Sequence, residues 1–365
     1  MHLRPRRRLY RLAGLAALIA VGASAGSALS ASTPVPVSAG GLRPLTNVNP
    51  LADPLGFFPR IVTIHAGDSV RWSINGFHTV TFPGPTKPYP FIVPGAGLQP
   101  VTNDAAGNPL WWGGKAPIMT VSPLAILQQG GGTMSSPPQV RSSGLLRVFT
   151  ASPNTPPAPY TIRFTKPGVY RYLCAVHQGM RGAVVVVPKH APVPSRARLI
   201  RLGQAQFARV VRQTRRLGKI KPAKPGRVFV GIGTPQGTNI TAMFPPKLTV
   251  KAGTTVRFAN MSVSDPHTVT FGPAAFRAQI EKTFVTPGNP TTFNPFGFFS
   301  SEPPGSPAPV AYDGTNHGDG YLNSGILLPK GSGAASRFSV TFSKPGTYNY
   351  ECVIHPNMDG KIVVT

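Results

Sequence analysis

Cys174-Ala-Val-His177-Gln-Gly-Met180 has the same spacing of Cys, His and Met as Cys352-Val-Ile-His355-Pro-Asn-Met358. Each copy follows a Tyr-x-Tyr-x run and precedes a run rich in valine. Two such runs around a short loop predict a β-hairpin. The loop of that hairpin would bring one Cys, one His and one Met side chain together.

The repeat extends outward from these loops. The matched blocks are Phe58–Gly67 with Phe244–Gly253, Phe77–Phe82 with Pro266–Phe271, and Arg163–Tyr172 with Thr341–Tyr350. The blocks alternate apolar and polar residues and are bounded by Gly, Pro, Asp and Ser, which indicates short, half-buried strands. The 40 glycines and 43 prolines also favour strands joined by long turns over helices. The chain is therefore predicted to be all-β, with one antiparallel β-sandwich in each half.

Each half also carries a histidine at a matched position upstream of its loop, His78 in the first and His267 in the second. A thiolate, two imidazoles and a weak thioether suit a copper ion that alternates between Cu(I) and Cu(II). One alternative is a disulfide between Cys174 and Cys352, but a disulfide would not need the repeated His and Met. Another is a half that keeps the fold and binds no metal.

These motifs resemble the cupredoxin (blue copper) family, and in particular its amicyanin and plastocyanin branch. The resemblance implies two Greek-key cupredoxin-like sandwiches in tandem, each with one type 1 copper ion. Carried over residue by residue, it implies two ligand sets: His78, Cys174, His177 and Met180 for the first ion, and His267, Cys352, His355 and Met358 for the second. The methionines would be weak axial ligands, and His177 and His355 would lie at the exposed edge, where electrons pass to partners.

Two features depart from the family pattern. Thr79 and Thr268 follow the upstream histidines where many members have Asn, so the hydrogen bonding near each Cys sulfur is expected to differ. The upstream His and the Cys are 96 residues apart in the first half and 85 in the second, roughly twice what the family needs. Residues 83–143 and 272–324 are therefore long insertions. They would cover the copper face, pack the halves together, bind a partner, or wrap the surface with no chemical role.

The first 31 residues have the features of a signal peptide. A cationic segment from Arg4 to Arg11 precedes an apolar segment from Leu12 to Val21, and small residues follow. Arg6-Arg7-Arg8 loosely fits a twin-arginine signal, and an uncleaved membrane anchor is the alternative. We expect export to the periplasm, the cell envelope or the medium. The predicted divisions are 1–31 signal peptide, 32–187 first domain, 188–227 basic linker and 228–365 second domain.

The chain is strongly basic, with 37 Lys and Arg against 10 Asp and Glu. Residues 188–227 hold twelve of these cations and no acid. A linker helix is predicted there. Its apolar face would hold Ile200, Phe207, Val210, Val211, Thr214 and Leu217, and Arg201, Arg209, Arg212 and Arg216 would lie mostly opposite. The charge favours acidic redox partner proteins or an anionic envelope or membrane surface, although a connector helix with a solvated face would look the same. No nucleic-acid recognition motif is present.

The leading functional prediction is one-electron transfer by a protein that is not an enzyme. A copper oxidoreductase of the multicopper oxidase or nitrite reductase type is an alternative, and it needs a second copper centre made of several histidines. Beyond the first residues only His65, His190 and His317 remain for such a centre, and they would have to converge. A copper carrier that never passes electrons would use the same ligands.

Overall fold

The computed structural model describes residues 33–84, 90–145, 158–177, 179–286 and 291–365. We call residues 33–187 the first half and 227–365 the second half. The predicted signal peptide, residues 1–31, lies outside the described residues, so export stays a prediction. None of the helices that are described combines the length and the apolar character needed to cross a membrane.

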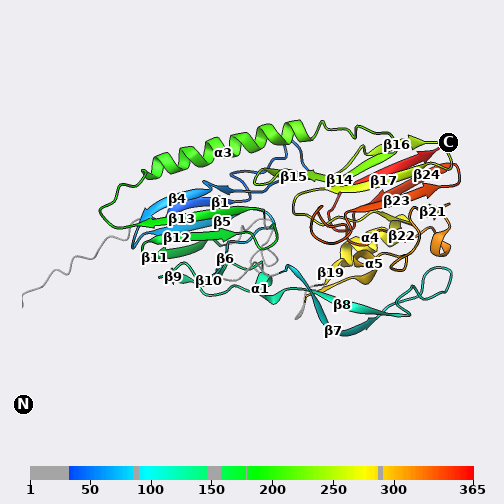
Figure 1. The fold of residues 1–365 in the computed structure, drawn as a ribbon, viewed down its shortest axis with the longest axis horizontal. Helices are drawn as coiled ribbons and strands as arrows, with labels where there is room; N and C mark the ends of the chain where they lie inside the picture. The colour runs from blue at the N-terminus through cyan, green and yellow to red at the C-terminus, as the bar shows by residue number, and fades with distance from the viewer. Residues whose placement is uncertain (1–32, 85–89, 146–157, 178, 287–290) are drawn as a thin grey trace, which may run out of the picture. The chain divides into compact units, whose positions relative to one another are not determined.

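The first half is a sandwich of two sheets (Figure 1). One sheet has the order β3 (Phe57–Phe58), β1 (Val35–Ala39), β5 (Ser69–Ile74), β11 (Tyr160–Phe164) and β9 (Gly132–Met134). The other has the order β10 (Val140–Ser142), β6 (Thr81–Pro83), β12 (Gly168–Leu173), β13 (Arg181–Val187) and β4 (Ile61–His65). Alternate residues of these strands point into one core, which is centred on the fully buried Trp72.

The second half repeats this architecture. Its larger sheet has the order β2 (Ala52–Pro54), β15 (Thr238–Phe244), β14 (Arg227–Gly233), β17 (Thr255–Met261), β23 (Arg337–Phe342) and β21 (Val310–Tyr312). Its smaller sheet has the order β16 (Lys247–Val250), β25 (Asp359–Val364), β24 (Gly346–Glu351), β18 (Thr270–Phe271) and β22 (Leu322–Asn323). Phe258 and Phe271 are fully buried in its core.

The two sandwiches share their strand connections. Strand β1 pairs in parallel with β5, as β14 does with β17, and β4 pairs in parallel with β13, as β16 does with β25. The hairpin β12–β13 corresponds in the same way to β24–β25. The prediction of two tandem all-β sandwiches is confirmed, but the expectation that each is antiparallel was wrong, because both contain parallel pairs such as β1–β5 and β14–β17. The exact domain boundaries stay predictions.

Strand β2 crosses from one half to the other. It belongs to the first half by sequence, yet it pairs with β15 of the second half, with Asn239 opposite Asp53. The main-chain N–H of Leu55 also donates to the carbonyl of Gly237 at 3.0 Å. The second half therefore takes an edge strand from the first.

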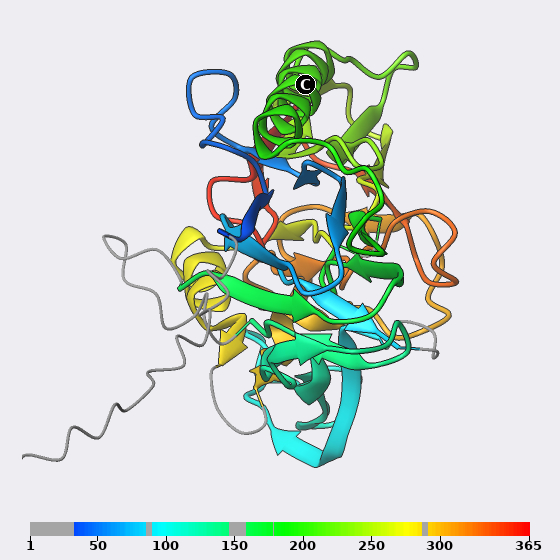
Figure 2. The same ribbon diagram turned by 90° about the vertical axis from the view of Figure 1, so that its left-hand side faces the viewer.

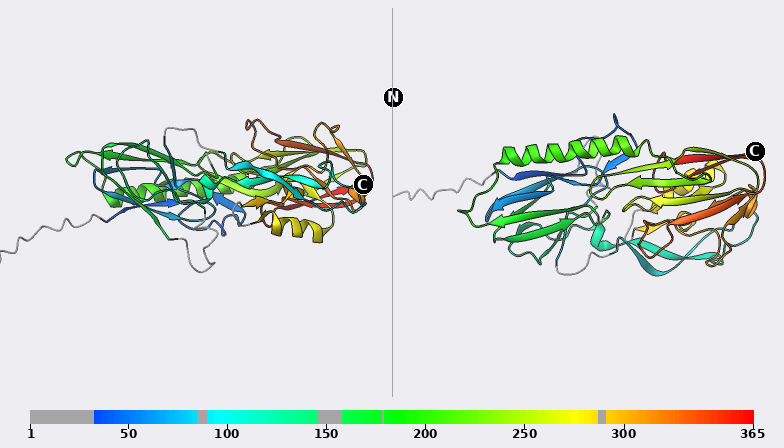
Figure 3. Two further views of the ribbon diagram at one scale, coloured as in Figure 1. Left: turned by 90° about the horizontal axis from the view of Figure 1, so that it is seen from below. Right: turned by 45° about the horizontal axis from the view of Figure 1, so that its top comes forward.

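The two predicted insertions meet each other. Strands β7 (Ile92–Pro100) and β8 (Lys115–Val121) of the first insertion form one sheet with β19 (Val285–Thr286) and β20 (Thr292–Phe293) of the second. Figures 2 and 3 show the cyan hairpin β7–β8 lying against the second half, on the side of the molecule opposite α3. The described residues of the insertions also form short helical segments: α1 (Pro123–Ile126), α4 (Ala274–Thr283), α5 (Pro295–Phe298) and the 3₁₀ segment Asn316–Gly318.

The insertions also share an apolar core. Trp112 of the first packs against Phe296 and Phe299 of the second, with ring centroids 6.1 and 5.8 Å apart. The Trp111 indole N–H donates to the Ser300 carbonyl at 2.9 Å. Of the roles left open by the sequence, the structure supports packing of the two halves together.

The predicted linker helix is present as α3 (Arg196–Leu217). It begins at Ser195, whose side chain accepts the N–H of Arg198 at 3.3 Å, and it contacts β1 and β3 of the first half and β15 of the second. Phe207 packs on Phe58 with centroids 5.5 Å apart. The prediction for Ile200 was wrong: it is 39% exposed, and the neighbouring Leu199 is buried instead. The four predicted arginines are all exposed.

Candidate metal centres

Each predicted ligand loop is closed by its own backbone. In the first half, Cys174 follows β12 and Met180 precedes β13, and the N–H of Cys174 donates to the Met180 carbonyl at 3.0 Å. In the second half the N–H of Cys352 donates to the Met358 carbonyl at 2.9 Å. These bonds continue the hairpin ladder past the last strand residues. The seven-residue spacing therefore fixes where the Cys, His and Met side chains leave the backbone.

Site 1 forms where His78, between β5 and β6, meets the first loop. The Cys174 Sγ atom lies 3.9 Å from Nδ1 of His78 and 3.7 Å from Nδ1 of His177. The two Nδ1 atoms lie 3.1 Å apart. All three side chains are buried.

Site 2 repeats this arrangement in the second half. The Cys352 Sγ atom lies 3.7 Å from Nδ1 of His267 and 3.5 Å from Nδ1 of His355. Cys352 and His267 are buried, and His355 is half-buried. The structure thus brings together the predicted Cys and both predicted histidines of each site.

The spacing of these atoms fits one small metal ion per site. Ligands about 120° apart, with a metal about 2.0 Å from nitrogen and about 2.3 Å from sulfur, lie roughly 3.5–3.8 Å from one another. The four sulfur–nitrogen distances are 3.9, 3.7, 3.7 and 3.5 Å. The residues present therefore suit a trigonal His₂Cys set.

The two predicted methionines are buried in the sandwich cores. Met180 and Met358 are each 1% exposed, and each belongs to the same buried cluster as the cysteine of its loop. A thioether in such a cluster is available as a weak, soft ligand.

The surroundings of both cysteines lower the pKa of the thiol and so favour the thiolate form. Burial alone would raise the pKa of Cys174, but hydrogen bonds and charge from His177 and His78 outweigh it and hold that pKa well below its usual range. Burial acts in the same sense on Cys352, where His267 and His355 outweigh it and lower the pKa. The thiolate is the form that binds metal. Both cysteines are free, so the disulfide alternative is excluded.

A threonine beside each upstream histidine ties the parts of its site together. The Thr79 N–H donates to Cys174 Sγ at 3.4 Å, and its hydroxyl accepts the N–H of Ala175 at 2.8 Å. Thr268 makes the same bonds to Cys352 Sγ at 3.3 Å and from the Val353 N–H at 3.0 Å. Thr79 and Thr268 thus fix each ligand loop against the segment that carries the upstream histidine.

The outer nitrogen of each histidine, Nε2, is the ring nitrogen that does not face the cysteine. These nitrogens have different partners at the two sites. At site 1, His78 Nε2 lies 3.2 Å from Asp53 Oδ1, and His177 Nε2 lies 3.2 Å from Asp265 Oδ1. At site 2, His267 Nε2 lies 2.7 Å from the hydroxyl of Ser262. Two carboxylates therefore contact site 1, and a neutral hydroxyl contacts site 2.

The contacts between these carboxylates and histidines shift the pKa values of both kinds of group. Burial alone would lower the pKa of His78, but the charge of Asp53 and a hydrogen bond to it raise that pKa to about 9. Burial alone would raise the pKa of Asp265, but the charge of His177 holds it well below its usual range. Asp265 is therefore a buried anion between the sites.

The prediction that His177 lies at an exposed edge was wrong. Its ring is 6% exposed because the second half covers it and supplies Asp265. The sequence reasoning also missed Asp53, Ser262 and Asp265. For the two aspartates the sequence offers one signal, which is that acidic residues are scarce. The chain has only 10 of them, and two lie at site 1.

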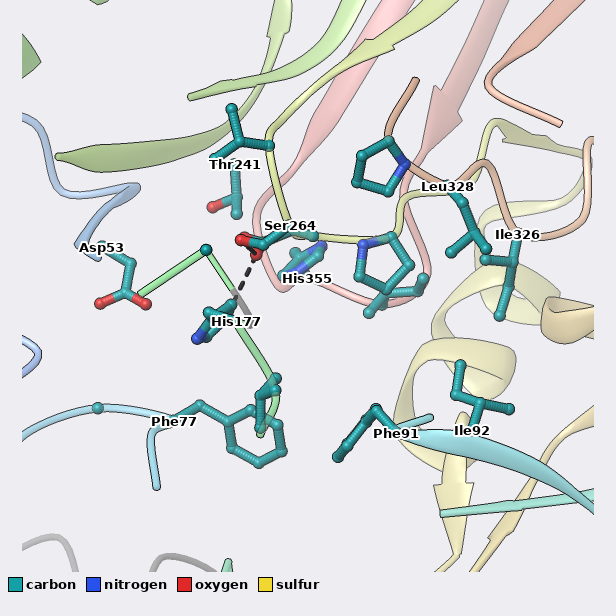
Figure 4. A pocket seen from close by; sticks show the side chains of 18 of the residues that line it. Asp53, Phe77, Phe91, Ile92, His177, Thr241, Ser264, Ile326, Leu328 and His355 are labelled. Atoms are coloured by element: carbon teal, nitrogen blue, oxygen red, sulfur yellow. Dashed lines mark hydrogen bonds and ion pairs between the residues drawn. The ribbon is translucent and has the colours of Figure 1, made fainter. Parts of the chain in front are cut away.

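The ligand loops of the two halves point toward a shared apolar core. Ala175 follows Cys174 and Val353 follows Cys352, and both belong to the buried cluster built from the insertions. A cleft of about 1210 Å³ adjoins this core and is lined by His177, His355, Asp53 and Asp265. Figure 4 shows both imidazoles at its wall, together with Phe77, Phe91 and Ile92. The two sites therefore face a common interface.

The three other histidines of the described residues have different surroundings. His65 Nε2 lies 2.9 Å from the carbonyl of Ala191, and His190 is exposed. His317 lies 3.2 Å from both Asp104 and Glu302. Among the residues that are described, only the two groups already given bring one ligand atom from each of three or more His, Cys, Asp or Glu residues within 4.8 Å of one another.

Known proteins that are similar to parts of this chain are found among solved structures. No family model and no curated protein matches the chain. Among solved structures, amicyanin from Paracoccus versutus is 21% identical, with 40% of this chain and 87% of that chain covered and a TM-score of 0.22. A purple cupredoxin from Nitrosopumilus maritimus is 20% identical, with 38% and 98% covered and a TM-score of 0.20. A mutant plastocyanin of fern is 22% identical, with 38% and 99% covered and a TM-score of 0.20.

The evidence for two similar domains comes from features within the chain. Apart from the added strand β2, both halves have matching strand orders. Both also carry a Cys-x-x-His-x-x-Met hairpin loop and hold a His-Cys-His group at that loop. The chain is therefore a tandem pair of β-sandwiches with one candidate metal group each, as the resemblance to cupredoxins predicts.

Proposed function

We propose that the protein binds one type 1 copper ion at each site and transfers single electrons. The observation that carries this proposal is the buried thiolate of each half, with two imidazole Nδ1 atoms facing it at 3.5–3.9 Å. Soft sulfur and imidazole ligands select copper, and the change between Cu(I) and Cu(II) supplies the one-electron step.

The protein's own contribution is to hold the ligands still. Cys, His and Met leave one backbone-closed loop, and the upstream histidine comes from the segment that Thr79 or Thr268 ties to that loop. The surrounding core excludes water from the sulfur. Ligands held in this way move little when the charge of the ion changes, and this favours fast electron exchange over metal release.

The test is direct. The copper-loaded protein should contain two coppers per chain, be intensely blue, bleach with a reductant and recover its colour with an oxidant while keeping its metal. A colourless protein with two coppers would overturn the type 1 assignment. Loss of copper to a chelator on reduction would favour a copper carrier, and turnover of nitrite or a phenol would favour an oxidoreductase.

We further propose that the protein is exported and that its partners are acidic. Residues 1–31 supply the export signal, and the terminal sequence of the mature protein outside the cytoplasm tests it. The exposed arginines of α3, among them Arg209, Arg212 and Arg216, offer a basic surface to an acidic redox protein. An anionic envelope surface would be held by the same charges.

A further inference from the structure

The two sites differ most in the charge around their histidines. At site 1 both outer nitrogens face carboxylates, Asp53 for His78 and Asp265 for His177, each at 3.2 Å. The two rings are buried, at 0% and 6% exposure, so these contacts are only weakly screened by water.

Site 2 has no equivalent contact. His267 Nε2 faces the neutral hydroxyl of Ser262 at 2.7 Å. Within the described part of the chain, neither His267 nor His355 lies within 4.0 Å of a carboxylate oxygen. Asp265 acts on both of these rings only at longer range.

Both carboxylates at site 1 are held by the second half. Asp53 lies on β2, opposite Asn239 of β15. The Asn239 side-chain amide donates to the carboxylate of Asp265. A single residue of the second half, Asn239, therefore lies next to both acids that face the first site.

A carboxylate on the outer nitrogen makes a metal-bound imidazole a stronger donor, and it adds negative charge near the ion. Both effects stabilise Cu(II) relative to Cu(I), since the more highly charged ion gains more from nearby negative charge. The site with two such contacts is therefore the harder one to reduce.

We propose that the two sites form an ordered redox pair, in which site 1 has the lower reduction potential and passes its electron to site 2 across the domain interface. This rests on the proposed copper binding. In the step, site 1 loses one electron and is oxidised, site 2 gains that electron and is reduced, and no bond breaks and no proton moves.

The interface provides a continuous connection for this step. His177 contacts the Asp265 carboxylate, and Asp265 precedes His267 by two residues. The residues next to the two cysteines, Ala175 and Val353, meet in one buried cluster. The route thus runs from a ligand of site 1, over one hydrogen bond, into the backbone segment that carries a ligand of site 2.

The experiment uses full-length protein with one site removed at a time. Cys352→Ser leaves site 1, and Cys174→Ser leaves site 2, and the visible band of each variant is followed in a redox titration. We expect site 1 to titrate at the lower potential, with at least a tenfold preference for leaving site 1 oxidised. That preference corresponds to about 59 mV for a one-electron couple.

Removing the carboxylate charges at site 1 tests whether they cause the difference in reduction potential. Asp265→Asn and Asp53→Asn, each in the Cys352→Ser background, should raise the potential of site 1, with either variant sufficient if the other fails to fold. Ser262→Ala in the Cys174→Ser background is the matched control and should move site 2 far less. Two blue sites with equal potentials, or site 2 lower than site 1, would overturn the ordered pair alone. A wild-type protein with no blue band would instead overturn the proposed function.

Discussion

A Cβ atom built on Gly231 would lie 2.2 Å from Nε2 of His267. Gly231 sits at a register shift in β14 with a φ of +67°, so both its backbone and the neighbouring ring exclude a side chain. Gly40 holds the matching place beside His78, with a Cβ position 2.3 Å from that ring. Each upstream histidine therefore occupies space that a glycine leaves open.

Gly231→Ala should abolish copper binding at site 2 and leave site 1 intact, because the His267 ring must move away from the Cys352 sulfur. Copper content and the visible band, measured in the Cys174→Ser background, check this. Gly253→Ala is the matched control: Gly253 also has a positive φ, +81°, but open space at its Cβ position. Equal losses in both variants would mean that backbone strain, and not the ring, is responsible.

Thr79→Val should weaken site 1. It removes the hydroxyl that accepts the N–H of Ala175 and leaves that buried donor without its partner, at a cost of about 1–3 kcal/mol in unfolding free energy. Copper affinity at this site should fall by roughly 10–100-fold. Thr79→Ser keeps the hydroxyl and should restore most of the affinity, which denaturant unfolding and copper competition would reveal. A serine variant as weak as the valine variant would speak against the hydrogen bond.

Trp112→Ala should lower the free energy of unfolding of the protein by about 3–5 kcal/mol, because it leaves a cavity in the apolar core shared by both insertions. The same core contains Ala175 and Val353, so the visible bands of both sites should shift together. Leu98→Ala, on the neighbouring strand β7 and 59% exposed, should change neither unfolding nor spectrum. A shift confined to one site would mean that the insertions act separately.

The loss of stability in His317→Gln should depend on pH. Hydrogen bonds to Glu302 and Asp104 raise the pKa of His317, so folding stabilises the protonated ring. This contribution is complete below the unfolded pKa of about 6.5 and disappears as pH rises through the folded value. The variant's midpoint in urea should therefore fall further below wild type at pH 6 than at pH 9. His190→Gln, at an exposed position, serves as control, and an equal deficit at both pH values would refute the ion pairs.

Neutralising α3 should slow electron exchange with an acidic redox protein. The triple variant Arg209→Gln, Arg212→Gln and Arg216→Gln should react more slowly at low ionic strength, and the difference should shrink at high salt, where surface charges are screened. Stopped-flow reduction at several salt concentrations measures this. An unchanged rate at low salt would place the partner elsewhere.

The grouping of the candidate ligands could be predicted because their positions follow from local structure. Cys174, His177 and Met180 share one hairpin loop, and the repeat identifies His78 and His267 as equivalent. The same reasoning predicted two sandwiches, since strand alternation is also a local property.

The residues that could not be predicted come from contacts between the halves. Asp265 reaches His177 only because the second half covers the first site, and the expectation of an exposed His177 assumed a domain that stands alone. Strands β19 and β20 have two residues each, too few for a periodic pattern, and their pairing with β8 joins distant segments. The prediction for Ile200 was wrong for another reason: helix α3 is rotated so that Leu199 and Gly203 face the sheet.

Strand β2 has a consequence for how such a duplicated protein can change. It gives the second sandwich an edge strand, and the second half in turn gives Asp265 to the first site, so each half contains a working part of the other. The two halves are thus no longer interchangeable modules. A single-domain relative grafted in place of either one would leave behind an uncovered sheet edge and a histidine without its acid, and recombination at the linker would be expected to yield inactive chimeras.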